Sequence, residues 1–195
     1  MKQLKIAIFL FITLMVPVAV IYPLLITSFG ELFFPWQAEG SLIRNSKGGV
    51  IGSALIGQHF QDPKYFWSRP SATDEYPYNP LASGGSNLGP TNEELIREIN
   101  DRLKYLRSYP GMDRSIPSEL VMASASGLDP HISLESALVQ IPRVARSRDL
   151  DEEKLRKIVL DTFEGRMFGF LGEPRVNVLI LNLTLDGFEV ESHVK

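Results

Sequence analysis

The chain has 195 residues, of which 20 are basic and 23 acidic, and it contains no cysteine. The absence of cysteine excludes disulfides, thiolate metal sites and a cysteine nucleophile. All acidic residues lie at Glu31 or later and only Lys2 and Lys5 precede that point, so the remainder carries 18 basic against 23 acidic groups, a net charge of −5. Binding the phosphate backbone requires a basic face, so this balance argues against a nucleic acid partner.

The N-terminal residues predict a membrane anchor. There are 25 uncharged residues between Lys5 and Glu31, and about 20 apolar residues are enough to cross the hydrocarbon core as a helix. A cleaved signal peptide would have a shorter apolar stretch and a small-x-small cleavage site. We therefore expect an uncleaved transmembrane helix and its outer interface at residues 6–34.

The charges that flank this span predict its orientation. The two lysines of residues 1–5 have no acidic neighbour, so the positive-inside rule places this segment in the cytoplasm and residues 35–195 outside it. Pro17 and Pro23 lie within the span. A kink at these prolines indicates a helical partner, although proline is also more frequent in membrane helices generally.

Beyond the anchor, the first predicted element is a β-hairpin. Residues 41–44 and 49–56 are short, apolar runs rich in β-branched residues, and the Asn45-Ser46-Lys47-Gly48 sequence between them is typical of a turn. Residues 61–90 contain five prolines and the Ser83-Gly84-Gly85-Ser86-Asn87 cluster, which predicts an extended, irregular segment. A loop of this length within a compact domain indicates a function or a partner.

Three helices are expected from residues that can cap their N-termini. Thr91 begins a capping box, and its helix should end near Ser108, before a Pro-Gly pair. Ser133 can cap the second helix, which Pro142 should kink or divide into two short pieces. Asp151 can cap the last helix.

The last predicted element is a buried strand. Val176 to Leu185 form a near-continuous apolar run, which the turn residues Asp186-Gly187 end. These elements predict an α+β fold: a single N-terminal transmembrane helix followed by one extracytoplasmic domain with a small sheet and about three helices.

Two patterns raise catalytic or nucleotide-binding hypotheses. Asp129-Pro130-His131 lies near Ser124 and Ser126, but no serine lies in a G-x-S-x-G motif, and an Asx-type turn before a helix is the alternative. The Ser83-Gly84-Gly85-Ser86-Asn87 cluster can direct backbone amides at a phosphate. It lacks the lysine of a Walker loop, and a flexible turn is the alternative.

Two clusters are candidate protein interfaces. Tyr65, Trp67 and Arg69 place aromatic rings and a guanidinium together, a combination enriched at interfaces. The alternative is that the two rings cover the edge of the core while Arg69 is solvated. The second cluster is basic and is more typical of a solvent-exposed face than of a phosphate site: Arg143, Arg146 and Arg148.

Several sequence blocks recur in the order and spacing of one known family. They are Phe34–Gln37, Gly52–Gln58, Tyr65–Phe66, Arg69–Ala72, Tyr78–Pro80, Ser83–Leu88, Ala123–Asp129, Gln140–Ala145, Val176–Asn177 and Leu181–Leu183. Together they resemble the KdpC family, the C subunit of the Kdp potassium-transporting ATPase. Because the blocks are many and span nearly the whole chain, the resemblance is specific.

The resemblance implies a non-catalytic accessory subunit of a high-affinity, ATP-driven potassium import complex in the bacterial inner membrane. Its partners would be a channel-like potassium-binding subunit, a P-type ATPase subunit and a small single-span subunit. It would assist assembly and act as a catalytic chaperone that raises the affinity of the ATPase subunit for ATP. No cofactor would be bound covalently and no metal site is expected; any contact with ATP would come through the ATPase subunit, and potassium is the transported ion.

The resemblance and the residue patterns together select candidate site residues. The nucleotide-contact candidates are Ser83, Gly84, Gly85 and Gln140. The partner-interface candidates are Tyr65, Trp67, Arg69, Asn87 and Arg143. Because the flanking lysines place the domain outside whereas ATP is cytoplasmic, we expect any effect on ATP affinity to be transmitted through the complex. A membrane-anchored extracytoplasmic hydrolase or binding module is the alternative function.

Overall fold

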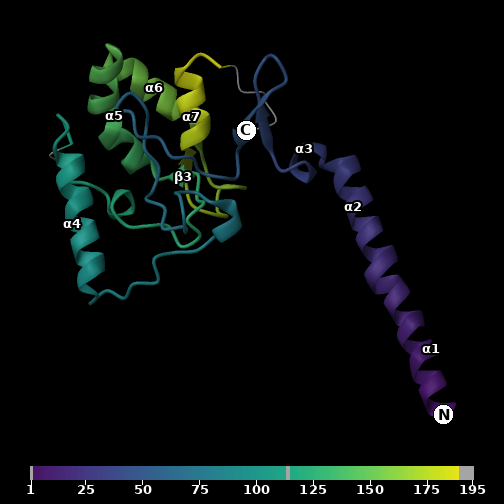
Figure 1. Ribbon diagram of the computed structural model, residues 1–195. Helices are drawn as coiled ribbons and strands as arrows, with labels where there is room; N and C mark the ends of the chain where they lie inside the picture. The colour runs from purple at the N-terminus through teal and green to yellow at the C-terminus, as the bar shows by residue number, and fades with distance from the viewer. Residues whose placement is uncertain (1, 113–114, 189–195) are drawn as a thin grey trace. The chain divides into compact units, whose positions relative to one another are not determined.

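The computed structural model describes residues 2–112 and 115–188 (Figure 1). The chain divides into two compact units between Leu42 and Ile43. The first unit contains a long apolar helix and the second contains small sheets and several helices, which confirms the predicted α+β fold. His193, one of the three histidines, lies outside the described residues.

The first unit is built around one continuous apolar helix. It consists of α1 (Lys2–Val16), a π-helical turn η1 (Pro17–Ile21) and α2 (Tyr22–Phe33), and its 32 residues are long and apolar enough to cross a membrane. Proline lacks an amide hydrogen and its ring collides with the preceding turn, and a π-helical turn is one local adjustment that accommodates it. The short helix α3 (Pro35–Ala38) follows.

The second unit begins with the predicted hairpin. Strands β1 (Leu42–Arg44) and β2 (Val50–Ser53) form a two-stranded sheet. The Asn45 side chain accepts hydrogen bonds from the backbone amides of Lys47 and Gly49, at 3.0 and 2.8 Å. Side-chain acceptance of this kind stabilises a turn, so the turn sequence has the role that was predicted for it.

The capped helices have the predicted positions, and the cap of the first of them is a correction. Helix α4 (Glu93–Arg107) is capped by Asn92, whose side chain accepts from Glu94 N, rather than by Thr91. Helix α5 (Leu134–Arg148), capped by Ser133, runs through Pro142 without dividing into two pieces. One lost hydrogen bond is tolerated because packing of an amphipathic face supplies most of a helix's stability, and α5 buries seven side chains.

A second, three-stranded sheet joins distant parts of the unit. Its order is β3 (His131–Ile132), β5 (Arg175–Asn177) and β4 (Phe163–Glu164), and both pairings are antiparallel. Helix α6 (Glu152–Thr162), which Asp151 caps as predicted, leads directly into β4. Helices α5 and α6 pack together, as do α6 and α7 (Figure 1).

The strand predicted at residues 176–185 is wrong beyond Asn177. Val178–Leu185 is helix α7, and the Asn177 side chain caps it by accepting from Ile180 N at 3.2 Å. Residues 178–183 are all buried. A helix buried on every side has no polar face, so its sequence lacks the periodicity that distinguishes it from a buried strand.

The core of the unit lies between α4, α5, α6, α7 and the three-stranded sheet. Its fully buried members include Phe66, Met112, Ile132, Val144, Leu155, Val159, Val176 and Leu181. Phe66 belongs to the irregular segment predicted at residues 61–90, so this segment is not a surface loop throughout its length.

Candidate functional site

Part of the irregular segment at residues 61–90 passes through the interior. Its backbone groups there form hydrogen bonds with side chains instead of with a neighbouring strand. The Asn182 amide accepts from Phe66 N at 2.8 Å and donates to Phe66 O at 3.0 Å. The Gln140 amide makes the same pair of bonds with Trp67, at 2.8 and 3.1 Å. Buried backbone groups need such partners, so these two carboxamides allow an extended chain to lie between α5 and α7.

Arg143 completes this arrangement from within α5. Its Nη1 donates to Pro63 O and Tyr65 O at 2.6 and 3.0 Å, and its Nη2 donates to Gln140 Oε1 at 2.6 Å. The guanidinium carbon lies 3.5 Å from the centroid of the Trp67 ring, a favourable cation–π geometry. Arg143 is only 1% exposed, so the prediction of a solvent-exposed basic cluster is wrong for this residue.

Burial dominates the electrostatics of Arg143. It lowers the pKa of the guanidinium to about 10, although the nearby phenols of Tyr109 and Tyr105 act in the opposite direction. The side chain stays protonated at neutral pH, and its charge is balanced by carbonyl oxygens and an aromatic face. Within the described part of the chain, no carboxylate forms an ion pair with it.

Arg148, five residues further along α5, binds the surface end of the same segment. Its Nε donates to Lys64 O at 2.7 Å, and its Nη2 pairs with Asp186 at 2.8 Å. The Tyr65 hydroxyl donates to the same carboxylate at 2.7 Å. The carbonyls of residues 63–67 are therefore all bound by side chains, and we call these residues the clamped segment.

The Ser83-Gly84-Gly85 sequence forms a loop that contacts residues 124–127. Gly84 N and the Ser83 hydroxyl both donate to Ser126 O at 3.0 Å. Gly127 has a φ of +67°, and a Cβ there would lie 2.8 Å from Gly84 O. The two stretches therefore approach closely only because glycine is present. Ser83 and Asn87 are exposed at the surface.

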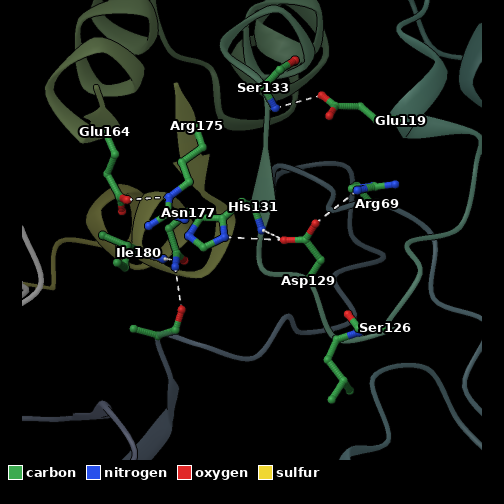
Figure 2. A network of polar contacts seen from close by, with 12 residues as sticks. Arg69, Glu119, Ser126, Asp129, His131, Ser133, Glu164, Arg175, Asn177 and Ile180 are labelled. Atoms are coloured by element: carbon green, nitrogen blue, oxygen red, sulfur yellow. Dashed lines mark hydrogen bonds and ion pairs between the residues drawn. The ribbon is translucent and has the colours of Figure 1, made fainter. Parts of the chain in front are cut away.

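A shallow hollow of about 430 Å³ lies beside this contact, and Arg69, Ser124, Asp129 and His131 are among its lining residues. Figure 2 shows Asp129 between Arg69 and His131. Its carboxylate is 3.2 Å from Arg69 Nη1 and 3.5 Å from His131 Nδ1, and it accepts from His131 N at 3.0 Å. Burial alone would raise the pKa of Asp129, but the hydrogen bonds from His131 and the Arg69 charge lower it below its ordinary value.

Replacing Asp129 by asparagine should lower the free energy of unfolding by about 1 kcal/mol at pH 7. A carboxyl with a depressed folded-state pKa stabilises the fold above its unfolded pKa of about 3.9, and this contribution is lost as the pH falls through the folded pKa. The difference from the parent should therefore disappear in acid urea titrations. Asp161→Asn, at an exposed position of α6, is the control; a difference that persists at low pH would contradict this account.

The hollow does not contain an assembled hydrolase triad. The Ser126 hydroxyl oxygen accepts from Leu128 N at 3.1 Å, and the Ser124 hydroxyl is buried without a hydrogen-bond partner in residues 2–112 and 115–188. Asp129 binds the backbone amide of His131, which is the Asx-type turn that was the alternative interpretation. Among the described residues, no group of three His, Cys, Asp or Glu side chains could hold a metal ion.

The structure separates the predicted site residues into two groups. The first group is exposed or half-buried: Ser83, Gly84, Gly85, Asn87, Tyr65 and Arg69. Gln140, Trp67 and Arg143 lie in the interior, with all four hydrogen-bonding positions of the Gln140 amide occupied, so a nucleotide contact by Gln140 requires this network to open. Sequence reasoning missed Asn182, although a polar residue in the middle of an apolar run was a signal.

Comparison with known proteins gives consistent results. Residues 4–187 match a family described as KdpC, the c chain of the K⁺-transporting ATPase. A "Potassium-transporting ATPase KdpC subunit" from Geobacter sulfurreducens is 53% identical over 186 residues, which cover 95% of this chain and 98% of that protein. A protein of the same description from Methylococcus capsulatus is 56% identical over 168 residues, covering 86% of this chain and 88% of its own length.

Proposed function

The chain belongs to the KdpC family of K⁺-transporting ATPase subunits, and from this premise we propose that it is a non-catalytic accessory subunit of a potassium import complex. It assists assembly of the complex and acts as a catalytic chaperone that raises the affinity of the ATPase subunit for ATP. Its partners are the channel-like potassium-binding subunit, the P-type ATPase subunit and the small single-span subunit. The observation that carries the proposal is the family match, which runs from the apolar helix to α7.

We propose a bacterial inner-membrane location for the chain. Residues 1–5 are cytoplasmic, residues 6–34 form the membrane span with its outer interface, and residues 35–195 form the extracytoplasmic domain. The basic N-terminus and the 32-residue apolar helix support this arrangement. The chain has no cysteine, so the variant Leu81→Cys carries a single thiol, at a position that is 93% exposed. Labelling of this thiol tests the proposed orientation. A membrane-impermeant maleimide should label this cysteine from the outside of intact cells, and labelling only after lysis would contradict the orientation.

The proposed effect on ATP affinity follows from contact between subunits. Ser83 and Asn87 offer exposed polar groups to a partner, and Gly84, Gly85, Tyr65 and Arg69 are half-buried. Gln140, Trp67 and Arg143 act indirectly in this proposal, because they fix the clamped segment from which Tyr65 extends. With the domain outside and ATP inside, the change in ATP affinity passes through the partner subunits.

The function is tested by separating the anchor from the domain. A chain truncated after Leu42, produced together with the other subunits, should give lower potassium uptake and a higher KM for ATP than the full chain. Uptake and KM equal to those of the full chain would contradict the proposal. A full chain that purifies alone from a mild detergent and hydrolyses an ester or peptide would instead support the hydrolase alternative.

A further inference from the structure

The hairpin formed by β4 and β5 ends in exposed apolar side chains, although no motif in this stretch was singled out in the sequence. Met167, Phe168, Phe170 and Leu171 are 65%, 81%, 71% and 48% exposed. We call residues 167–171 the apolar tip. Burying side chains of this size is the main source of stability in folding and association, and within residues 2–112 and 115–188 these four are left largely uncovered.

The apolar tip is held in a defined conformation. Met167 N donates to Leu171 O and Leu171 N to Met167 O, both at 2.9 Å. Two ion pairs cross the hairpin below it: Arg166 with Glu173 at 3.0 Å, and Arg175 with Glu164 at 2.9 Å. Figure 2 shows the second pair joining the two strands. The tip is therefore a preorganised projection, which lowers the entropy cost of binding.

The backbone at the tip adopts an unfavourable conformation. Phe168 has a φ of +53°, and Gly169, which follows it, has a φ of +80°. A bulky side chain in the left-handed region is strained, and strained residues cluster at functional sites. In this conformation the Phe168 ring is exposed to solvent. Packing within the described part of the chain therefore does not explain why the strained backbone is kept.

We propose that the apolar tip inserts into an apolar recess on another protein subunit of the potassium import complex, an inference that rests on the proposed function. Methionine and aromatic side chains are enriched at the centres of protein interfaces. A lipid surface fits less well, because segments that bind a membrane surface through Phe and Leu also carry free Lys or Arg that contact the anionic headgroups. The tip contains no Lys or Arg, both arginines beside it are paired with glutamates, and the chain after the anchor is acidic.

The test uses the full chain with a single cysteine in place of Phe168. The rate of maleimide labelling is measured for the chain alone in detergent, for the chain alone in phospholipid vesicles, and for the purified complex. Labelling should be at least tenfold slower in the complex than in either of the other states. Leu160→Cys, on α6 and 50% exposed, is the matched control and should react at similar rates in all three.

The outcomes separate this inference from the proposed function. If the complex forms but Phe168→Cys reacts as fast as in the chain alone, the tip is free and the inference is wrong while the subunit assignment stands. Slow maleimide labelling in vesicles that lack the partner subunits would show that the tip enters the bilayer. This result would also overturn the inference. If the chain does not purify with the ATPase subunits at all, both proposals fail. As a second variant, Phe168→Ser with Phe170→Ser should reduce the recovery of the chain with its partners at least fivefold.

Discussion

Replacing Arg143 by methionine should lower the free energy of unfolding by about 3–5 kcal/mol. Methionine retains much of the apolar stem but donates no hydrogen bond. The carbonyls of Pro63 and Tyr65 and the amide oxygen of Gln140 would each lose a donor, and a buried acceptor left without a partner costs about 1–3 kcal/mol. The stacking on Trp67 would be lost as well. Urea unfolding of the full chain in detergent, followed by tryptophan fluorescence, measures the effect.

Arg146→Met is the matched control, because Arg146 lies on the same helix and is exposed. It should change the free energy of unfolding by less than about 0.5 kcal/mol. Arg143→Lys should recover only part of the loss, because an ammonium keeps the charge but lacks the planar fork that reaches several acceptors. Equal effects of the two methionine variants would show that Arg143 does not hold the clamped segment.

Replacing Asn182 by aspartate should destabilise the fold by about 3–4 kcal/mol at pH 7. The change is nearly isosteric, but an oxygen then faces Phe66 O, where the amide nitrogen now donates at 3.0 Å. Asn182 is only 1% exposed, so the new carboxylate would be buried. Unfolding should be measured in urea at several pH values.

The pH dependence gives this prediction a specific sign. Burial without a cation raises the folded-state pKa of a carboxyl, so the penalty is absent below the unfolded pKa of about 3.9 and grows as the pH rises above it. The stability difference should therefore shrink between pH 7 and pH 4. Gln140→Glu is the matched comparison and should cost less, because Arg143 Nη2 lies 2.6 Å from Gln140 Oε1. A larger loss for Gln140→Glu, or no pH dependence for Asn182→Asp, would contradict the account.

Much of the fold follows from local sequence signals. The caps at Ser133 and Asp151 and the Asn45 turn act over two to four residues, so the residues that produce them are close together in the chain. The error at α7 arose because a run buried on every side carries no periodicity. Its polar residues, Asn177 and Asn182, serve as a cap and as a backbone partner, roles that become visible only in three dimensions.

The candidate site was less predictable, because its contacts are distant in sequence. Arg143 was grouped with Arg146 and Arg148 as solvent-exposed, and a basic triplet on a helix usually is. Its burial depends on carbonyls that lie 78 and 80 residues earlier, which no local pattern reveals. The apolar tip was likewise missed, because apolar residues between glycines are typical of buried turns as well as of projections.

The clamped segment has a consequence for how the protein is made. The buried backbone amide of Phe66 is satisfied by Asn182, which lies 116 residues further along the chain. The entropy cost of closing a loop of this length must be met before the contact can stabilise the fold. A nascent polypeptide therefore exposes the Tyr65-Phe66-Trp67 aromatics until Asn182 has left the ribosome. Premature termination before α7 should leave an unfolded remnant for proteases to remove, rather than a stable fragment that competes with the intact subunit.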